Sequence, residues 1–136
     1  MTEQITQQET PLAAAQQPVP AAWPSEIRLA ADKSALDIAF DDGARFSIPA
    51  ELLRVESPSA EVQGHAPHEK ITVAAKRAVR ITGIEMTGNY AIRITFDDGH
   101  STGIYPWALL YRYGRDQTAL MAAYVDALKA RGLSRD

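Results

Sequence analysis

Two stretches of the chain share one pattern of apolar and polar residues. Residues 36–53 read LDIAFDDGARFSIPAELL, and residues 92–110 read IRITFDDGHSTGIYPWALL. Apolar residues alternate up to Phe-Asp-Asp-Gly, which predicts a strand with one apolar face. Asp-Gly tolerates the positive φ of a tight hairpin turn, and the Pro followed by Leu-Leu is typical of a short helix. The chain therefore contains an internal repeat, and each unit is predicted to be a β-hairpin followed by a short helix.

The two copies differ in length between the turn and the helix. Six positions separate Gly43 from Pro49, and seven separate Gly99 from Pro106. An extra residue in one strand of a pair is what a β-bulge requires. We therefore expect a bulge in the second unit, and left-handed backbone conformations at both turn glycines.

Other segments complete the predicted fold. Residues 79–96 read as two strands, with a second bulge where the alternation breaks at Gly83 and a turn at Gly88. Residues 54–70 are rich in Pro, Gly and polar residues and predict a long loop. Apolar residues at helical spacing predict a helix from Asp116, as N-cap, to Arg131. The expected fold class is α+β: an antiparallel sheet of β-hairpins with short helices and a C-terminal helix.

Composition limits the function. Residues 1–24 contain hardly any large apolar residue and predict a flexible tail, which leaves one domain over residues 25–136. The net charge of -3 does not favour binding to nucleic acid or to anionic membranes. The N-terminus lacks the features of a secretory signal, and a cytoplasmic protein is expected. The chain has no cysteine, which excludes disulfides, thiolate catalysis and zinc-thiolate sites.

Two motifs carry a family resemblance. They are LLRVESPSAEVQGH at residues 52–65 and GNYAIRITFDDGHSTGIYPWALLYRYG at residues 88–114. Both resemble the gamma-butyrobetaine hydroxylase-like N-terminal domain family, a family of unknown function. The resemblance implies a domain that is separate from the catalytic iron domain of the eukaryotic hydroxylase. Some relatives are fused to a nucleotide-binding carrier of iron–sulfur clusters, which implies an accessory role near iron–sulfur or oxygenase chemistry.

The resemblance also places a lost zinc site. In the eukaryotic relatives, three cysteines and one histidine hold a structural zinc. These ligands fall on Ser57, Ser59, Val62 and His100, so only the histidine remains. A structural zinc needs four well-placed ligands, so no metal, cofactor or catalytic residue is expected.

Several residues allow two interpretations. The Asp-Asp pairs resemble acid/base dyads but are the ordinary signal of a turn. Ser57 and Ser59 lack the sequence context of a nucleophile, so turn hydrogen bonds are favoured. We expect the ring of His100 to bond to Ser57 or to loop carbonyls. Tyr and Trp serve equally in cores and in recognition surfaces, so the aromatic residues between 105 and 113 fit either use.

The expected function is that of a non-catalytic module that binds an unidentified protein partner or serves as an accessory domain. Its predicted surface combines the loop at residues 57–68 with the segment 103–113. The candidate residues are His65, His100, Tyr105, Trp107 and Tyr111. The alternative is a domain that binds a small ligand or a metal through the region of His65 and His100.

Overall fold

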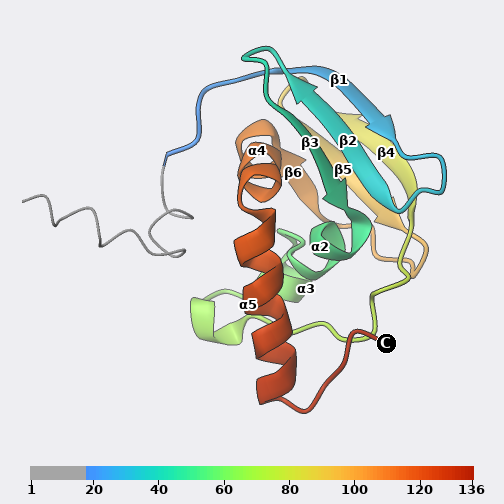
Figure 1. Ribbon diagram of the computed structural model, residues 1–136, viewed down its shortest axis with the longest axis vertical. Coiled ribbons are helices and arrows are strands. Elements are labelled where there is room, and N and C mark those ends of the chain that lie inside the picture. The colour runs from blue at the N-terminus through green and yellow to red at the C-terminus, as the bar shows by residue number, and fades with distance from the viewer. Residues whose placement is uncertain (1–17) are drawn as a thin grey trace, which may run out of the picture.

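The computed structural model describes residues 18–136 and shows three classes of element, β-strands, α-helices and one 3-10 turn (Figure 1). In chain order they are β1 (Pro24–Leu29), β2 (Ala35–Phe40), β3 (Arg45–Pro49), α2 (Ala50–Val55), α3 (Ala60–Gln63), the 3-10 turn η2 (Pro67–Glu69), β4 (Ile81–Thr87), β5 (Ala91–Phe96), β6 (Ile104–Pro106), α4 (Trp107–Arg115) and α5 (Gln117–Ala130).

The strands form two antiparallel sheets, with the orders β1-β2-β3 and β4-β5-β6. The predicted α+β class and the antiparallel hairpins are confirmed, but the strands make two sheets where a single sheet of hairpins was expected. In Figure 1 the first sheet lies in front of the second, and α5 runs along one side of both. Each repeat is therefore three strands followed by a helix, so the repeat is one strand longer than its sequence motif.

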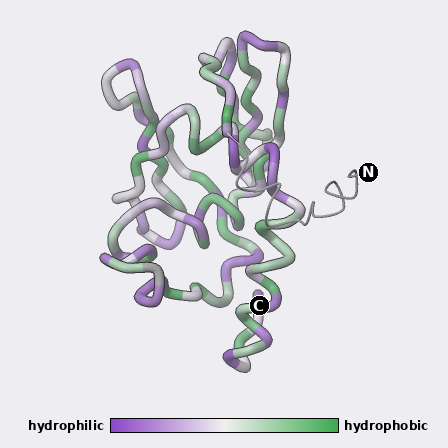
Figure 2. Tube along the Cα trace, turned by 90° about the vertical axis from the view of Figure 1, so that its left-hand side faces the viewer, coloured by the Kyte–Doolittle hydropathy of each residue, from purple (hydrophilic) through white to green (hydrophobic). Residues whose placement is uncertain are grey.

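The core lies between the two sheets because the central strands β2 and β5 point their apolar faces at each other. The alternating residues that the sequence assigns to these faces are all buried in one cluster: Leu36, Ile38, Phe40, Ile92, Ile94 and Phe96. Burial of each such side chain stabilises the fold by about 1.5–3 kcal/mol. Figure 2 shows hydrophobic chain along the strands and hydrophilic chain at several of the turns.

The two sheets carry bulges at corresponding places. β1 shifts register between Pro24 and Glu26, and β4 does so between Ile81 and Gly83, next to the glycine where the sequence predicts a bulge. The hydroxyls of the bulged residues, Ser25 and Thr82, both donate to a carbonyl of the central strand at 3.3 Å. The equivalence shows that the repeat extends over β1 and β4, where the sequences share no motif.

The first aspartate of each Phe-Asp-Asp-Gly motif closes the end of its sheet. Asp41 Oδ1 accepts a hydrogen bond from the backbone N–H of Trp23 at 3.2 Å, and Asp97 Oδ1 accepts one from Arg80 at 3.1 Å. The backbone N–H groups of both aspartates donate in return to the carbonyls of Trp23 and Arg80. Both residues therefore serve the turn, as one of the two interpretations expects.

The second aspartate of each motif joins the two repeats. One oxygen of Asp42 and one of Asp98 accept the N–H two residues further on, which fixes the turn. The other oxygen of Asp42 accepts from the hydroxyl of Tyr111 in α4 at 2.8 Å. The other oxygen of Asp98 accepts from Nε of Arg54 in α2 at 2.7 Å. Each helix is thus bonded to the turn of the other repeat.

The extra residue of the second repeat lies just before β6. The N–H of Phe96 donates to the carbonyl of His100, while Arg93 is paired with Ile104. A constant register would place residue 103 opposite Arg93, so one residue is inserted between His100 and Ile104. The predicted extra residue is confirmed, and it widens the segment that faces residues 57–61.

The helices and connections differ in part from the expectation. The segment 54–70 is not an uninterrupted loop, because α2 extends through Val55 and is followed by α3 and η2. Asp116 directly precedes α5 as predicted, but its carboxylate pairs with Arg115 and makes no cap hydrogen bond. The helix ends before Gly132, which has the expected positive φ of 66°.

The predicted flexible tail lies mostly outside the described residues, since residues 1–17 are not described. The described part of the tail joins the first sheet at Trp23, whose backbone pairs with Asp41. No helix within residues 18–136 is long and apolar enough to cross a membrane.

The glycines of the structure give the first testable prediction. Gly43 and Gly99 have φ values of 94° and 91°, as predicted, with open space where a Cβ would lie. Gly43→Val should lower the free energy of unfolding by about 1–2 kcal/mol through backbone strain alone, and Gly43→Asn by less. At Gly114 a Cβ would lie 2.3 Å from the ring of Phe46, so even Gly114→Ala should cost about 1–3 kcal/mol. Urea denaturation measures all three, and equal losses for Gly43→Asn and Gly43→Val would contradict the assignment of strain.

Candidate functional site

The aromatic residues proposed as a recognition surface belong mainly to the core. Tyr105 is 0% exposed and Trp107 is 8% exposed. The Tyr105 hydroxyl donates to the carbonyl of Leu53 at 2.6 Å, and the Trp107 indole N–H donates to that of Asn89 at 3.0 Å. The prediction that Tyr105 and Trp107 form an exposed surface is wrong, because both side chains pack inside with their polar atoms bonded to backbone. Tyr111 is partly buried.

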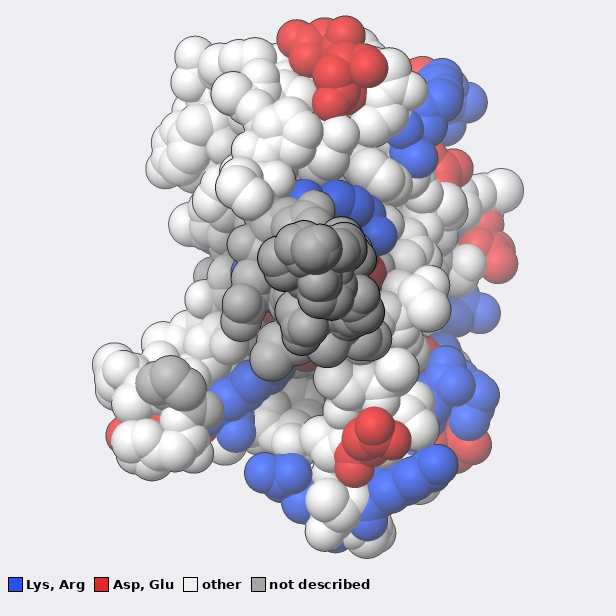
Figure 3. Space-filling model, turned by 60° about the vertical axis from the view of Figure 1, so that its left-hand side comes forward, with Lys and Arg blue, Asp and Glu red and all other residues white. Residues whose placement is uncertain are grey.

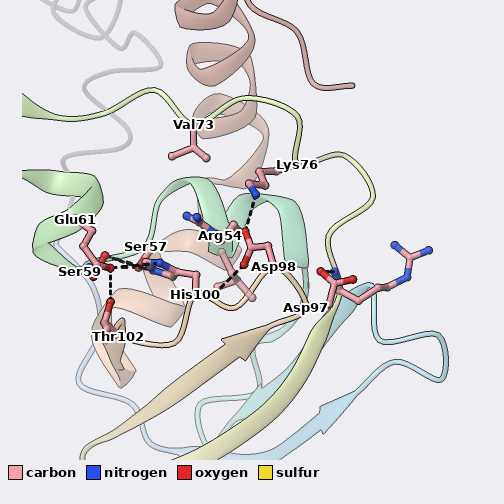
Figure 4. A network of polar contacts seen from close by, with 12 residues as sticks. Arg54, Ser57, Ser59, Glu61, Val73, Lys76, Asp97, Asp98, His100 and Thr102 are labelled. Carbon is pink, nitrogen blue, oxygen red and sulfur yellow. Dashed lines mark hydrogen bonds and ion pairs between the residues drawn. The ribbon is translucent and has the colours of Figure 1, made fainter.

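A polar cluster forms where the zinc ligands of the relatives are expected (Figure 4). Nε2 of His100 lies 2.9 Å from Oγ of Ser57 and 3.4 Å from Oγ of Ser59. Nδ1 of His100 lies 3.4 Å from a carboxylate oxygen of Glu61, which also accepts from the Thr102 hydroxyl at 2.6 Å. The carboxylate beside Nδ1 favours the proton on that nitrogen, so Nε2 accepts from Ser57. The expected bond between His100 and Ser57 is confirmed.

The order serine, histidine, carboxylate in this cluster is that of a hydrolase triad, but the serine is closed off. Ser57 is 0% exposed, and its Oγ also accepts from the backbone N–H of Ser59. A Cβ placed on Gly103 would lie only 2.5 Å from that Oγ, so the backbone of Gly103 covers it. A nucleophile must reach its substrate, and this oxygen is enclosed by protein. The hydrogen bonds of the cluster therefore hold the loop in place, as the interpretation of Ser57 and Ser59 as turn residues expects.

The cluster does not have the composition of a metal site. Val62, at the third cysteine position, is a buried apolar residue. Within residues 18–136, no three His, Asp or Glu residues are grouped as metal ligands would be. His65 is exposed and is not among the polar partners of His100, which are Ser57, Ser59 and Glu61. The structure therefore does not bring His65 and His100 together as the metal-binding alternative requires.

The Asp98 carboxylate lies beside this cluster and gathers three donors. Nε of Arg54 and Nζ of Lys76 each lie 2.7 Å from Oδ2, and the His100 N–H donates to Oδ1. Burial opposes ionisation of Asp98, but the hydrogen bonds from Lys76, His100 and Arg54 outweigh it and hold its pKa well below the usual range. The carboxylate therefore stays ionised and holds two cations and the His100 turn together.

The pKa of His100 is also lowered. Burial is the main cause, because the imidazolium would lose its hydration, and the nearby Arg54 guanidinium acts in the same direction. Glu61 and Asp98 oppose these effects without outweighing them. His100 is thus held neutral, which matches its role as an acceptor from Ser57.

The structure also contains a groove that the sequence did not indicate. It lies between the end of η2 with the segment 70–73 that follows it and one face of α5, and has a volume of about 280 Å³. Its lining residues are mostly small or aliphatic: Val55, Glu56, His68, Lys70, Ile71, Thr72, Val73, Ala123, Tyr124, Ala127 and Arg131. The one signal in the sequence was the pair Ala123 and Ala127, whose spacing puts two small residues on one face of a helix.

The groove has a fixed floor and an open apolar edge. The Tyr124 hydroxyl donates to the carbonyl of Val73 at 2.5 Å, which holds the extended segment against α5. Ile71 leaves 53% of its surface exposed at the edge. Lys70 bonds both carboxylate oxygens of Glu56 at 2.8 Å, and Arg131 adds a further cation. Figure 3 shows Lys and Arg side chains in the lower half of this side of the molecule.

The lowered pKa of His100 predicts a pH dependence of stability. Its folded pKa lies below the reference value of 6.5, so the unfolded chain binds more protons between the two values. The stability that neutral His100 contributes is complete above 6.5 and is lost as the pH falls toward the folded pKa. We expect the unfolding free energy to fall between pH 7.5 and 5.5, and to fall less in His100→Gln. An NMR titration in which the His100 ring protonates above 6.5 would contradict this.

Comparisons with known proteins agree with the fold and with the motifs. The family described as gamma-butyrobetaine hydroxylase-like, N-terminal, matches residues 27–111. Two NMR solution structures are similar over most of both chains. One is 39% identical, with a TM-score of 0.73, over 85% of this chain and 90% of the other. The second is 40% identical, with a TM-score of 0.72, over 88% and 86% of the two chains.

A third solved structure connects the fold to a family without a known function. It is the crystal structure of a protein of unknown function of the DUF971 family from Acidithiobacillus ferrooxidans. It is 32% identical, with a TM-score of 0.54, over 65% of this chain and 89% of the other. No curated protein matches the chain. Since the family match covers more than half of its residues, the chain belongs to the gamma-butyrobetaine hydroxylase-like N-terminal domain family.

Proposed function

We propose that this domain is a non-catalytic interaction module that binds an extended peptide segment of a partner protein in the groove beside α5. The observation that carries the proposal is Ile71, an aliphatic side chain more than half exposed at the edge of a groove that is lined by both apolar and polar residues. Exposed apolar surface with a polar rim is typical of protein interaction sites. The polar cluster supports a non-catalytic role, because the serine that it contains, Ser57, is buried.

The dimensions of the groove favour a peptide. Its volume of about 280 Å³ lies at the lower limit of the roughly 300–1,000 Å³ of small-molecule pockets. Its α5 wall presents Ala123 and Ala127, which lie one turn apart and project little from the helix. A chain can therefore approach the helix closely and place one or two aliphatic side chains against Tyr124 and Ile71.

The opposite wall offers backbone groups to such a chain. Within the described part of the protein, the N–H groups of Thr72 and Val73 and the carbonyl of Thr72 make no backbone hydrogen bond. Extended peptides commonly bind by pairing with an exposed extended segment, which supplies affinity through main-chain bonds. The segment 70–73 belongs to no strand and is exposed or partly exposed, so its free backbone groups are available for this mode.

The charges of the rim favour an acidic partner. Glu56 is neutralised by Lys70, and Arg131 remains as the other fully charged residue of the lining. The rim of the groove is therefore positive, although the whole chain has a net charge of -3. The expected ligand is an extended segment with an aliphatic residue and a neighbouring Asp or Glu.

Two adjacent alanines provide a matched test. Ala122 and Ala123 are both exposed on α5, but only Ala123 lines the groove. Glu is a good helix former, so Ala→Glu should leave α5 intact at either position. Ala123→Glu should fill the groove and oppose an acidic ligand, while Ala122→Glu adds the same charge outside it.

The probe is a random peptide library displayed on phage and selected against the full chain. We expect enrichment of peptides that combine an aliphatic residue with a neighbouring carboxylate. The selected peptides should bind Ala122→Glu as they bind the unchanged protein and should lose binding to Ala123→Glu. Selection that yields no peptides, or peptides that bind both variants equally, would overturn the proposal.

A further inference from the structure

We infer that the chain carries its own ligand for this groove, in the segment 9–15, which reads ETPLAAA. The inference rests on the proposed function, because it assigns an occupant to the same groove. The segment precedes the described residues and is joined to them at Pro18. Its docking would make the domain self-occupied until a partner displaces it.

The chemistry of the segment matches that of the groove. Leu12 is the one large aliphatic residue between positions 6 and 18, and Glu9 is the only charged residue there. The three alanines that follow Leu12 suit a shallow wall formed by Ala123 and Ala127. Glu9 provides the carboxylate that the positive rim at Arg131 favours.

The attachment point lies within reach. Arg115, at the end of α4, donates from Nη1 to the carbonyl of Pro18 at 3.0 Å, which holds this end of the segment beside the start of α5. Ala123 and Ala127 lie six and ten residues beyond Gln117, or about 9 and 15 Å along the helix axis. Leu12 lies six residues before Pro18 and can extend about 20 Å from it. The reach of the linker therefore exceeds the rise along α5 from its start to the alanines of the groove.

The short connection makes even weak docking effective. A ligand on a short linker experiences an effective concentration on the order of millimolar at its site. A partner peptide then binds only the fraction of molecules with a free groove, so its apparent affinity falls in proportion to that fraction. By competing for the groove, the segment 9–15 would thus raise the affinity that a partner peptide needs in order to bind.

The test uses the full chain with a spin label at one introduced cysteine. The chain has no cysteine of its own, so Gln7→Cys gives a unique attachment site beyond the proposed ligand. The probe is the nitroxide, and the readout is broadening of backbone amide signals in NMR spectra. We expect the signals of Ile71 and Ala127 to lose most of their intensity, while that of Glu85, on the edge strand β4 of the second sheet, is retained. Leu12→Asp should restore the broadened signals.

The controls separate this inference from the proposed function. Ala123→Glu should abolish the broadening and Ala122→Glu should not. Broadening that appears when labelled and isotope-enriched chains are mixed, but not within one chain, would assign the segment to a second copy and overturn the inference. Absence of broadening at Ile71, with selected peptides still lost in Ala123→Glu, would overturn the inference and leave the proposed function standing. Absence of broadening at Ile71, together with selected peptides that bind Ala123→Glu as well as Ala122→Glu, would overturn both the inference and the proposed function.

Discussion

The rest of this structure depends on the carboxylate of Asp98. It fixes its own turn through the N–H of His100 and accepts from Arg54 of the first repeat and from Lys76 of the connecting segment. The contacts with Arg54 and Lys76 join parts of the chain that are far apart in sequence. The equivalent Asp42 makes one such contact, with Tyr111. The paired sheets supply most of the buried apolar area, and these polar contacts determine how the helices of one repeat sit against the turns of the other.

The same carboxylate connects the polar cluster of Ser57, Ser59 and His100 to the groove. It places His100 against Ser57 and thereby fixes the start of the segment 54–70. Further along, the carbonyl of Val62 accepts the N–H of Ile71 at 2.7 Å, which positions the groove wall. A hydrogen-bonded cluster thus holds a loop that relatives are expected to hold with zinc. Hydrogen-bonded side chains can hold a loop in this way where most of the polar groups are buried and have partners.

The sequence predicted local structure well and long-range arrangement poorly. The positive φ of Gly43, the bulge at Gly83 and the helix before Gly132 follow from local sterics and periodicity. Alternation assigns residues to a face of a strand but does not say how many sheets the strands form. Burial of Tyr105 was unpredictable for a related reason, because Tyr accepts either a core or a surface site if its hydroxyl has a partner. The groove arises from segments brought together by the fold, so the spacing of Ala123 and Ala127 indicates only one of its walls.

The central claim about Asp98 and Arg54 is that their direct contact across the repeats stabilises the fold. A double-mutant cycle with Asp98→Asn and Arg54→Met tests this directly, with unfolding free energies measured in urea at pH 7.5. Since both side chains are largely buried and in direct contact, we predict a coupling energy of about 1–3 kcal/mol, so that the double variant is more stable than the sum of the single losses implies. Additive losses within about 0.3 kcal/mol would show that the two groups act independently and would contradict the account.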